Sequence, residues 1–361
     1  MRSEIRVGLL TKGLNRGGIE TLLLEQVTAP TSTAISYSVA YCLHGADALA
    51  AEISKSCPVA LVATSQSRLL FDKRFWRWLR SLDVVHVQNP VVASLVRVIP
   101  RRLGRPPIVY TEHQMWGGYN PISRALNRLS YFASNRSFAV SSRVLSSMSE
   151  RAKSTTEVLI HGITPIPEAE KQSQTGLRHD LLGVEDEDFL FVTVANHRKE
   201  KNLPLLIEVA DRVKHLNPGA TFIHIGAGPL EQENLASNED AGGPVTFMGH
   251  RSDVRLILPL CDAFLLTSDF EGLPVALMEA FSAGLPVIST DSGGVSELVN
   301  EANGLLAAPG DKNRLIESCI YMIDNKASFT EGIRATAELV DRGHFIKALE
   351  ATYKELALAD A

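Results

Sequence analysis

Short apolar segments alternate with helical patterns along this chain, and the alternation occurs in two successive series. The expected strands of the first series are 5–10, 38–42, 59–62, 84–87, 108–111, 137–140 and 158–160. Those of the second series are 189–195, 221–225, 245–248, 263–267 and 287–289. Strands that alternate with helices favour a parallel sheet covered on both faces. The sequence therefore predicts an α/β protein with two doubly wound, Rossmann-like domains.

Residues 162–188 separate the two series, are rich in Pro, Gln, Glu and Asp, and lack sustained periodicity. We therefore expect one domain at 1–165 and another at 166–342. A chain of 361 residues is long enough for two domains that each bury a core. Because ligands bind doubly wound sheets beyond the carboxyl ends of their strands, we expect the two domains to face a central cleft.

The composition describes a globular protein, with 45% hydrophobic residues. No run of about 18 apolar residues suggests a membrane span, and no signal peptide precedes the first strand, so we expect a cytoplasmic location. The four cysteines are Cys42, Cys57, Cys261 and Cys319. Their scattered positions support neither a zinc site nor a disulfide framework, so we expect them to be packing residues.

The net charge of −5 conceals two oppositely charged halves. Residues 1–165 hold 20 Lys and Arg against 10 Asp and Glu, whereas residues 166–361 hold 16 against 31. Within residues 71–105, eight basic residues accompany two acidic ones, and Phe and Trp interleave with the bases at helical spacing. This pattern is typical of a helix on an anionic membrane surface. It is equally typical of a helix whose aromatic residues enter a core while its arginines stay in water.

The stretch 269–290 joins an apolar strand to a helix through a carboxylate and a glycine. Gly272 would let the backbone approach a ligand closely, and Pro274 suits the first position of the helix. Free amides that follow, including those of Leu273 and Val275, would then lie at the positive end of the helix dipole. The pattern predicts an anion site that suits a phosphate.

Two carboxylates flank the expected anion site. Glu271 lies in the loop, and Glu279 lies five residues beyond Pro274, which is about 7.5 Å along a helix at about 1.5 Å per residue. A carboxylate beside a phosphate would repel it, so we expect both to hold sugar hydroxyls on either side. The alternative is that they only stabilise the start of a helix and its exposed face.

This stretch resembles the Glu-x7-Glu signature of retaining glycosyltransferases of family 4. The resemblance is carried by Glu271 and Glu279, by residues 284–288 (Gly-Leu-Pro-Val-Ile) and by residues 293–297 (Gly-Gly-Val-Ser-Glu). It implies the two-domain GT-B fold, with the acceptor bound by the first domain and a nucleotide sugar by the second. It also implies that a last helix at 343–361 packs back on the first domain.

Residues 194–203 end a strand and open a helix, and they resemble the family segment whose arginine and lysine bind the donor diphosphate. Lys201 matches the lysine in register, but Asn196 occupies the place of the arginine. We infer that Arg198, two residues further on, supplies the missing guanidinium. Positioned cations of this kind stabilise the charge that develops on a departing diphosphate. The alternative is a solvated basic turn after a strand.

Two segments of the first domain also resemble family motifs. Gly17 and Gly18 follow the first strand and precede an apolar helix, as in the family loop whose glycine amides approach the donor phosphate. His113 ends a strand and resembles the family histidine that touches the donor sugar. A lone histidine is otherwise more often structural. Its neighbour Glu112 should point to the other side of the sheet.

The Asp-x-Asp pattern at 186–188 matches the metal motif of the other glycosyltransferase fold, but solvated acidic runs are usual in linkers. We therefore expect no metal ion, no cofactor besides the donor substrate, and no nucleic-acid partner. The first glycine loop also fails the Gly-x-Gly-x-x-Gly spacing, which argues against a dinucleotide dehydrogenase.

The resemblance implies a retaining glycosyltransferase that moves a sugar from a UDP- or GDP-linked donor to an acceptor hydroxyl. The expected acceptor is a lipid-linked saccharide in surface polysaccharide assembly, reached by peripheral membrane contact through residues 71–105. The expected catalytic residues are Glu271, His113, Arg198 and Lys201. The donor would further contact Gly17, Gly18, Gly272, Leu273, Pro274, Val275 and Glu279.

Two alternatives stay open. A sugar-nucleotide epimerase on the same two-domain plan would process the donor without an acceptor. A non-catalytic sugar-nucleotide-binding protein is the second alternative, because Asn196 departs from the family pattern.

Overall fold

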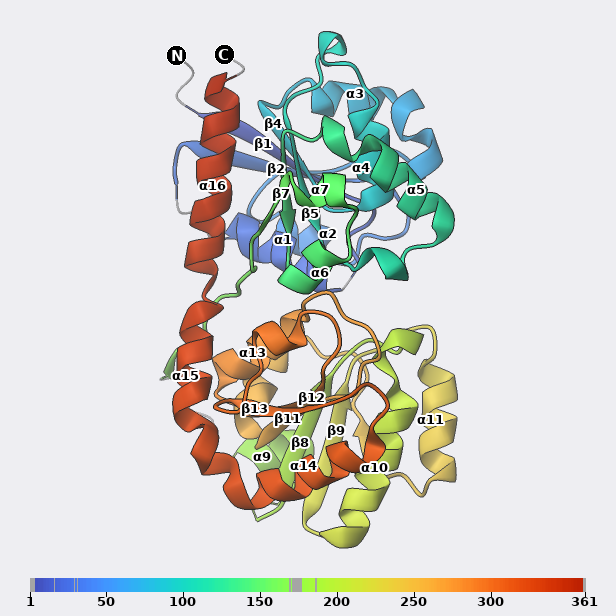
Figure 1. Ribbon diagram of the computed structural model, residues 1–361, viewed down its shortest axis with the longest axis vertical. Coiled ribbons are helices and arrows are strands. Elements are labelled where there is room, and N and C mark those ends of the chain that lie inside the picture. Colours follow the sequence, from blue (N-terminus) through green and yellow to red (C-terminus); the bar gives the residue numbers. More distant parts are fainter. Residues whose placement is uncertain are drawn as a thin grey trace. The chain divides into compact units, whose positions relative to one another are not determined.

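A computed structural model of the protein describes residues 4–15, 17–28, 30, 32–168, 170, 177–185 and 187–359 (Figure 1). The chain divides into two compact units. Unit 1 comprises Met1–Gly162 and Arg342–Ala361, and unit 2 comprises Ile163–Asp341. Each unit has its own sheet, in which all strands run parallel.

Unit 1 contains seven strands in the order β3-β2-β1-β4-β5-β6-β7. They are β1 (Ile5–Thr11), β2 (Ile35–Tyr41), β3 (Val59–Leu61), β4 (Val84–Val87), β5 (Ile108–Glu112), β6 (Arg136–Ala139) and β7 (Thr156–Val158). The order reverses between β1 and β4, which pair with each other in parallel. Such a reversal is the switch point at which doubly wound sheets bind ligands.

Unit 2 contains six strands in the order β10-β9-β8-β11-β12-β13. They are β8 (Phe189–Val194), β9 (Ala220–Ile225), β10 (Val245–Phe247), β11 (Ala263–Leu266), β12 (Val287–Thr290) and β13 (Gly304–Ala307). The switch point of this sheet lies between β8 and β11, which pair in parallel. The two sheets confirm the predicted α/β class with two doubly wound bodies.

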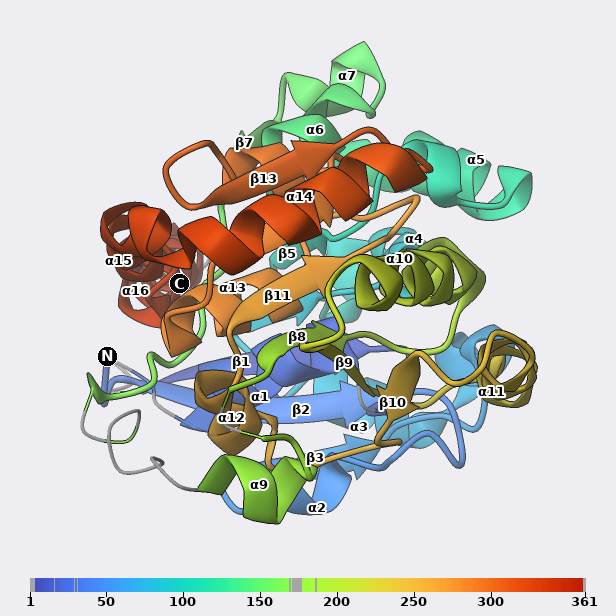
Figure 2. The same ribbon diagram turned by 90° about the horizontal axis from the view of Figure 1, so that it is seen from below.

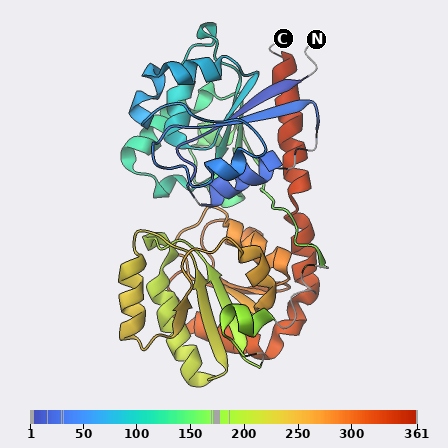
Figure 3. The same cartoon turned by 180° about the vertical axis from the view of Figure 1, so that it is seen from behind.

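The helices of unit 1 come from both ends of the chain. They are α1 (Gly18–Thr28), α2 (Ala50–Ile53), α3 (Lys73–Leu79), α4 (Pro90–Arg97), α5 (Pro121–Ser130), α6 (Ser142–Ser146), α7 (Glu150–Lys153) and α16 (Arg342–Ala359). Figure 3 shows α16 alongside the sheet of unit 1, where it contacts β1 and β4. Leu349 and Tyr353 of α16 are fully buried in one apolar cluster with Val7 and Val39. Burial of this apolar face holds the last helix on the first sheet.

The helices of unit 2 are α9 (Leu177–Leu182), α10 (Leu203–Leu216), α11 (Glu231–Asp240), α12 (Val254–Ile257), α13 (Val275–Ala283), α14 (Lys312–Asn325) and α15 (Thr330–Leu339). Figure 2 shows α10 and α14 side by side on unit 2, and the two helices are in contact. On α10, Leu206, Val209 and Val213 recur at three- and four-residue intervals and are buried. This spacing is the periodicity expected of a helix with one buried face.

Local features differ from those expected, and the strand expected at 158–160 is observed as β7 at Thr156–Val158. β13 was not predicted, because a four-residue strand that begins with a glycine gives a weak strand signal. A Cβ at Gly304 would lie 2.2 Å from the carbonyl oxygen of Val287, so the glycine permits the close pairing with β12. Part of the linker expected at 162–188 belongs to unit 2. The linker contains α9, and the Ile166 amide donates a hydrogen bond to Ser282 Oγ of unit 2 at 2.7 Å.

The basic segment 71–105 does not form one exposed helix. Phe71 ends a short 3-10 helix and is 86% exposed, whereas Phe75 belongs to α3 and is fully buried, as the core alternative predicts. Arg97 and Arg105 are buried as well, so their charges are not available to a surface. The basic side chains that stay exposed are Lys73, Arg74, Arg77, Arg80, Arg101 and Arg102.

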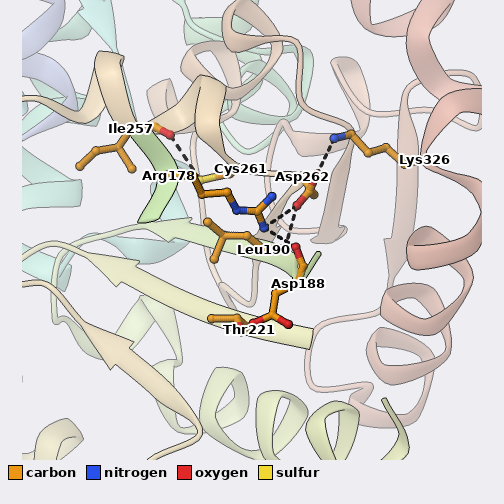
Figure 4. A network of polar contacts seen from close by, with 8 residues as sticks. All are labelled: Arg178, Asp188, Leu190, Thr221, Ile257, Cys261, Asp262 and Lys326. Carbon is orange, nitrogen blue, oxygen red and sulfur yellow. Dashed lines mark hydrogen bonds and ion pairs between the residues drawn. The ribbon is translucent and has the colours of Figure 1, made fainter. Parts of the chain in front are cut away.

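A polar network fastens the amino ends of β8 and β11 in unit 2 (Figure 4). Asp262, just before β11, accepts hydrogen bonds from the Leu190 amide at 2.8 Å and from Arg178 at 3.0 Å. Its other oxygen accepts from Lys326 Nζ at 2.7 Å. Because ligands bind at the opposite, carboxyl edge of such sheets, this network has a structural role.

The acidic pattern at 186–188 lies beside this network. Asp186 is outside the described residues. Asp188 accepts a hydrogen bond from Thr221 Oγ1 at 3.3 Å, and its carbonyl accepts one from Arg178. In the described ranges, no group of three or more His, Cys, Asp or Glu side chains is arranged to hold a metal ion.

All four cysteines are buried and unpaired with one another, which confirms their expected role as packing residues. Burial raises the pKa of Cys42 to about 12 and that of Cys57 to about 11. Among the helices that the structure describes, none has the length and apolar character needed to cross a bilayer.

Candidate active site

The carboxyl ends of β8 and β11 define the candidate site of unit 2. These strands are neighbours at the switch point of the sheet. Lys201 lies in the turn that follows β8, and Glu271 and Gly272 follow β11. The fold therefore brings together three residues that the sequence assigned to donor binding, although they come from two separate segments.

Glu271 is a buried carboxylate, 7% exposed, with two hydrogen-bond donors on one oxygen. Lys201 Nζ lies 2.5 Å from its Oε1, and Ser268 Oγ lies 2.7 Å from the same atom. Charge-assisted hydrogen bonds of this kind are short and fix geometry. Ser268 was not among the site residues predicted from the sequence. Its position at the end of a strand, three residues before Glu271, is the signal that could have found it.

Further hydrogen bonds join the two loops of the site. Thr267 Oγ1 donates to the carbonyl oxygens of Lys201 and Asn202, each at 3.2 Å. The Asp269 amide donates to the Glu200 carbonyl at 2.9 Å, and Asn202 Nδ2 donates to Asp269 Oδ1 at 2.9 Å. The turn after β8 is therefore fixed to the loop after β11, and the lysine is held before any ligand arrives.

The loop after β12 supports the same site through two glycines. Gly293 has a φ of +59°, and a Cβ there would lie 1.9 Å from the carbonyl oxygen of Glu271. The Gly294 amide donates to the Gly272 carbonyl at 2.7 Å. Only a residue without a side chain allows this approach. The glycine pair therefore supports the main chain of the Glu271 loop.

The helix after this loop begins one residue later than expected. Pro274 has a ψ of 124° and is the N-cap of α13 rather than its first helical residue, because that ψ is extended. Leu273 and Val275 are buried, so only their main-chain groups are suited to meet a ligand. Amides in a first helical turn have no acceptor within the helix, and here they follow Gly272 directly. Glu279 is half-buried and is the fifth residue of α13.

Arg198 is less well placed than Lys201. Its side chain is exposed, and we find no ion pair or hydrogen bond of its guanidinium among the described residues. Its amide donates to the Asn196 carbonyl at 2.8 Å, which closes a tight turn. The preceding His197 is buried against Asn234, with 3.1 Å between Nδ1 and Nδ2. Within the part of the chain that the structure describes, no hydrogen bond or ion pair therefore orients the Arg198 guanidinium.

In unit 1, His113 directly follows β5 and lies next to the end of β4. Its Nε2 is 2.6 Å from Gln88 Oε1, and Gln88 Nε2 is 3.3 Å from His86 Nε2. His86 Nδ1 in turn lies 2.6 Å from the Tyr353 hydroxyl of α16. Gln88 was not predicted from the sequence, although a polar residue directly after a buried strand at the switch point is a recognisable signal.

The ring of His113 is held neutral. Burial lowers the pKa of His113 well below its usual value, and the neighbouring His161 and His86 lower this pKa further. The ring centroids of His113 and His161 are 6.4 Å apart. At neutral pH the His113 ring is therefore a hydrogen-bonding group and not a cation.

The glycine pair of unit 1 lies at the start of α1, which begins at Gly18. The Gly17 carbonyl accepts a hydrogen bond from the Thr21 amide at 2.9 Å. A Cβ at Gly17 would lie 2.8 Å from Glu20 Oε2, so the turn is crowded. The residue before this pair, Arg16, is outside the described residues.

Glu112 lies in the interior of unit 1. It is fully buried and accepts hydrogen bonds from Trp116 Nε1 at 2.8 Å and Asn127 Nδ2 at 2.9 Å. The hydroxyls of Tyr110 and Tyr119 donate to it as well. Four donors satisfy this carboxylate, so it is a structural group and not part of the strand-end site.

Two family models match the chain, one covering most of the amino-terminal part of unit 1 and the other most of unit 2. The model described as Glycosyltransferase Family 4 matches residues 16–164, and the model described as Glycosyl transferases group 1 matches residues 187–325. Together with the two doubly wound sheets, they define the class of protein. This chain belongs to glycosyltransferase family 4.

Curated relatives have related descriptions. The chain is 27% identical to the putative glycosyltransferase EpsD of Bacillus subtilis, over 63% of this chain and 64% of EpsD. It is 26% identical to the UDP-Gal:alpha-D-GlcNAc-diphosphoundecaprenol alpha-1,3-galactosyltransferase of Escherichia coli, over 68% of this chain and 67% of that enzyme. The matched region thus spans just under two thirds of the first relative.

Solved structures show the same fold. The HepE protein of Anabaena in complex with UDP superposes with a TM-score of 0.81 at 20% identity, over 97% of this chain and all of HepE. Sucrose-phosphate synthase of Thermosynechococcus elongatus superposes with a TM-score of 0.81 at 13% identity, over 99% of this chain. The fold is GT-B, as the resemblance implied.

Proposed function

We propose that this protein is a retaining glycosyltransferase that moves a sugar from a nucleoside-diphosphate sugar to an acceptor hydroxyl. The observation that carries the proposal is the ion pair of Lys201 and Glu271 at the switch point of unit 2. A cation, a carboxylate and a glycine loop before a helix start lie together there. A sugar diphosphate offers the complementary groups, namely anionic phosphates and sugar hydroxyls.

Lys201 is the group proposed to stabilise the departing diphosphate. Thr267 and the loop after β11 hold its turn in place, so no rearrangement of the main chain is needed when charge develops. Arg198 would add a second cation that becomes ordered on the phosphates. Because these cations suit the developing charge, we propose that transfer does not require a metal ion.

The carboxylates and the first turn of α13 have separate proposed roles. The amides that follow Gly272 would receive a phosphate oxygen, helped by the helix dipole. Glu271 would accept hydrogen bonds from the hydroxyls of the transferred sugar, and Glu279 from those of the ribose. The Lys201 and Ser268 contacts hold the Glu271 carboxylate in a fixed direction for this task.

In the proposed reaction, the bond between sugar C1 and the diphosphate oxygen breaks, and the acceptor oxygen bonds to C1 on the same face. A diphosphate oxygen takes the proton of the acceptor hydroxyl, so the products are a glycoside and a nucleoside diphosphate. His113, as a neutral ring, would hold the donor sugar by a hydrogen bond and would not donate a proton. Gly17 and Gly18 would present amides to the phosphates.

For the acceptor we propose a lipid-linked saccharide, used at the cytoplasmic face of a membrane. Relatives support this, since one is named for a diphosphoundecaprenol acceptor and another is the alpha-monoglucosyldiacylglycerol synthase of Acholeplasma laidlawii, which is 25% identical over 61% of this chain. The exposed basic side chains of 71–105 would make peripheral contact with anionic lipid. The donor base is proposed to be uracil or guanine.

A donor-binding experiment tests the proposal directly. We expect UDP or GDP to raise the thermal unfolding midpoint of the wild-type protein, because a ligand that binds only the folded state stabilises it. Lys201→Ala should lose most of this shift, whereas Lys312→Ala on α14 removes another lysine paired with a glutamate and should retain it. A wild-type protein that none of the UDP, GDP and ADP sugars stabilises would contradict donor binding.

A transfer assay separates the proposed activity from its rivals. With a UDP or GDP sugar and a lipid-linked saccharide, the product should keep the anomeric configuration of the donor, as read by NMR, and EDTA should not change the rate. Isomerisation of the donor without any acceptor would favour an epimerase. Binding without turnover for every acceptor tried would favour a non-catalytic binder.

A further inference from the structure

α5 turns its polar side inward and its apolar side outward. Within the described residues of this helix, Asn127 is the only buried one. The large apolar side chains of the helix, by contrast, are exposed: Ile122 is 74% exposed, Leu126 45% and Leu129 72%. They recur at four- and three-residue intervals, so they form one stripe along the helix. Phe132, just beyond the helix, is 64% exposed and extends the stripe.

Buried charges fix this orientation. Asn127 Oδ1 accepts a hydrogen bond from Arg97 at 2.7 Å, and Asn127 Nδ2 donates to Glu112 at 2.9 Å. Arg97 also donates to Ser134 Oγ at 2.9 Å and lies over the Tyr110 ring, 4.2 Å from its centroid. Rotating α5 to hide its apolar stripe would leave a buried guanidinium and a buried carboxylate short of partners. That cost keeps the stripe in solvent.

The segment that carries the stripe is rich in basic residues, although Arg136 within it pairs with Glu157 at 3.5 Å and with Glu355 at 2.7 Å. Residues 113–154 contain six Lys and Arg and one acidic residue. The basic residues are Arg124, Arg128, Arg136, Arg143, Arg151 and Lys153, and the acidic one is Glu150. Glu150 pairs with Lys153 at 2.7 Å, and the guanidinium of Arg151 lies over the Phe132 ring, 5.1 Å from its centroid.

We propose that the α5 stripe, defined as Ile122, Leu126, Leu129 and Phe132, is a docking surface for an anionic lipid bilayer. An apolar stripe beside exposed arginines is the composition of an interfacial helix, whose side chains enter the acyl boundary while its bases meet lipid phosphates. Figure 1 shows α5 at the periphery of unit 1, with its outer side not covered by another element of that unit.

Charge decides between a bilayer and a second copy of this chain. A symmetric dimer through α5 would place the same basic residues opposite one another, and like charges repel. An anionic bilayer attracts them instead. The inference deepens the proposed function, on which its biological use rests, because it places the unit proposed to bind the acceptor at the surface that holds lipid-linked saccharides. It also assigns the apolar anchor of the membrane contact to α5, whereas residues 71–105 contribute exposed basic side chains.

Vesicle cosedimentation of the full-length protein tests the proposal. We expect the wild-type protein to bind phosphatidylcholine vesicles that contain phosphatidylglycerol, and to bind pure phosphatidylcholine vesicles much more weakly. Ile122→Ser with Leu129→Ser should reduce binding by about tenfold or more, because two apolar anchors are lost. Arg124→Gln with Arg128→Gln should reduce it less and should flatten its dependence on salt.

The matched control is Leu216→Ser with Leu235→Ser, which replaces two exposed leucines of unit 2, 52% and 43% exposed. This pair should bind vesicles like the wild type. All variants should keep the wild-type circular dichroism and the thermal shift with UDP or GDP. Vesicle binding and donor binding are read separately, so failure of one does not imply failure of the other.

Four results would overturn the proposal. The first is a wild-type protein that does not bind anionic vesicles, and the second is an Ile122/Leu129 variant that binds them as well as the control pair does. The third is a wild-type dimer in size-exclusion chromatography that this variant converts to a monomer, which would identify the occupant as a second copy. The fourth is a Phe71→Ser variant that loses all vesicle binding, which would place the apolar anchor in residues 71–105.

Discussion

Lys201 and Glu271 form an ion pair of 2.5 Å across the switch point of the unit 2 sheet, although they are 70 positions apart in the chain. The lysine is proposed to bind the donor diphosphate and the glutamate the donor sugar. Without donor, the Lys201 ammonium and the Glu271 carboxylate are hydrogen-bonded to each other. When donor binds, Lys201 would contact the phosphates as well as Glu271. The sugar hydroxyls would then replace part of the contact between Lys201 and the Glu271 carboxylate.

Lys201→Ala is therefore expected to lower kcat/KM by about a hundredfold, as loss of one positioned charge-stabilising group commonly does. It should also destabilise the fold, since the nearly buried Glu271 would lose its cation; we expect a loss of about 1–3 kcal/mol. Steady-state kinetics and urea unfolding measure the two effects. In the double variant with Glu271→Gln, stability should partly recover, and a purely additive loss would disprove the coupling of the two residues.

Ser268→Ala removes the second donor to Glu271 and keeps the ion pair. We expect a stability loss of about 1 kcal/mol and a smaller fall in kcat/KM than Lys201→Ala gives. Ser289→Ala is a suitable control, because Ser289 is also a fully buried serine of the same sheet but donates to a main-chain carbonyl. Equal transfer rates for Ser268→Ala and the wild type would show that Glu271 needs no second donor.

Gly293→Ala should damage both stability and transfer. The new Cβ would meet the Glu271 carbonyl and would also strain a φ of +59°. Gly310→Ala is a matched control, because Gly310 has a φ of +80° but no atom lies within 4 Å of its added Cβ. The control should lose about 1 kcal/mol from backbone strain alone. Chemical unfolding of both variants measures the difference, and similar losses would exclude the steric argument.

Acid should unfold the protein through its buried histidines. Burial, and then the nearby His197, lower the pKa of His224 from 6.5 to about 3, and burial lowers that of His86 to about 3. Between pH 6.5 and about pH 3, the two histidines bind protons in the unfolded chain but not in the folded one. The free energy of unfolding is therefore highest above pH 6.5 and falls as the pH falls towards 3. Each ring adds a slope of up to about 1.4 kcal/mol per pH unit.

His224→Phe should make that loss shallower, because within the described residues neither ring nitrogen of His224 has a hydrogen-bond partner that phenylalanine would forfeit. His215→Phe replaces an exposed histidine of α10 and should leave the pH dependence unchanged. Urea unfolding at several pH values measures the slopes. An unchanged slope in His224→Phe would show that this ring is not protonated on unfolding.

Gln88→Glu should change the pH profile of transfer. The wild-type amide contacts a neutral His113, whereas a carboxylate at the same 2.6 Å contact would favour the imidazolium and raise the pKa of His113. We expect lower kcat/KM at neutral pH that recovers as the pH rises. Gln88→Leu should lower kcat/KM at every pH, since it only removes the positioning contact. Identical profiles for both variants would contradict a requirement for neutral His113.

Most of the fold could be predicted from the sequence, because strand and helix periodicity are local properties. The strands at 84–87 and 245–247 were found almost at their observed bounds. β13 was missed because its four residues carry little local signal and its close pairing depends on Gly304 meeting another strand. α13 begins one residue later than predicted, because a proline such as Pro274 can occupy either the first helical position or an N-cap with extended main chain.

The candidate site was predicted in part. Motif spacing identified Lys201, Glu271 and Gly272, since these residues are conspicuous in their own segments. It did not show that the first two pair with each other, and it missed Ser268 and Gln88. Those two residues are ordinary in sequence, and their importance comes from the residues that the fold places beside them.

By itself, the sequence determined that this chain forms two parallel α/β sheets, and it predicted an anion site after the strand that ends near residue 267. Both conclusions rest on patterns among residues close together in the chain. Only the tertiary structure decided which side of α5 meets water. The spacing of Ile122, Leu126 and Leu129 suits a buried helix face equally well. The polar side of α5 faces inward instead, because Asn127 forms hydrogen bonds with the buried charged groups of Arg97 and Glu112. Residues distant in sequence set that balance, because a buried charge costs more to leave without partners than an apolar side chain costs to expose.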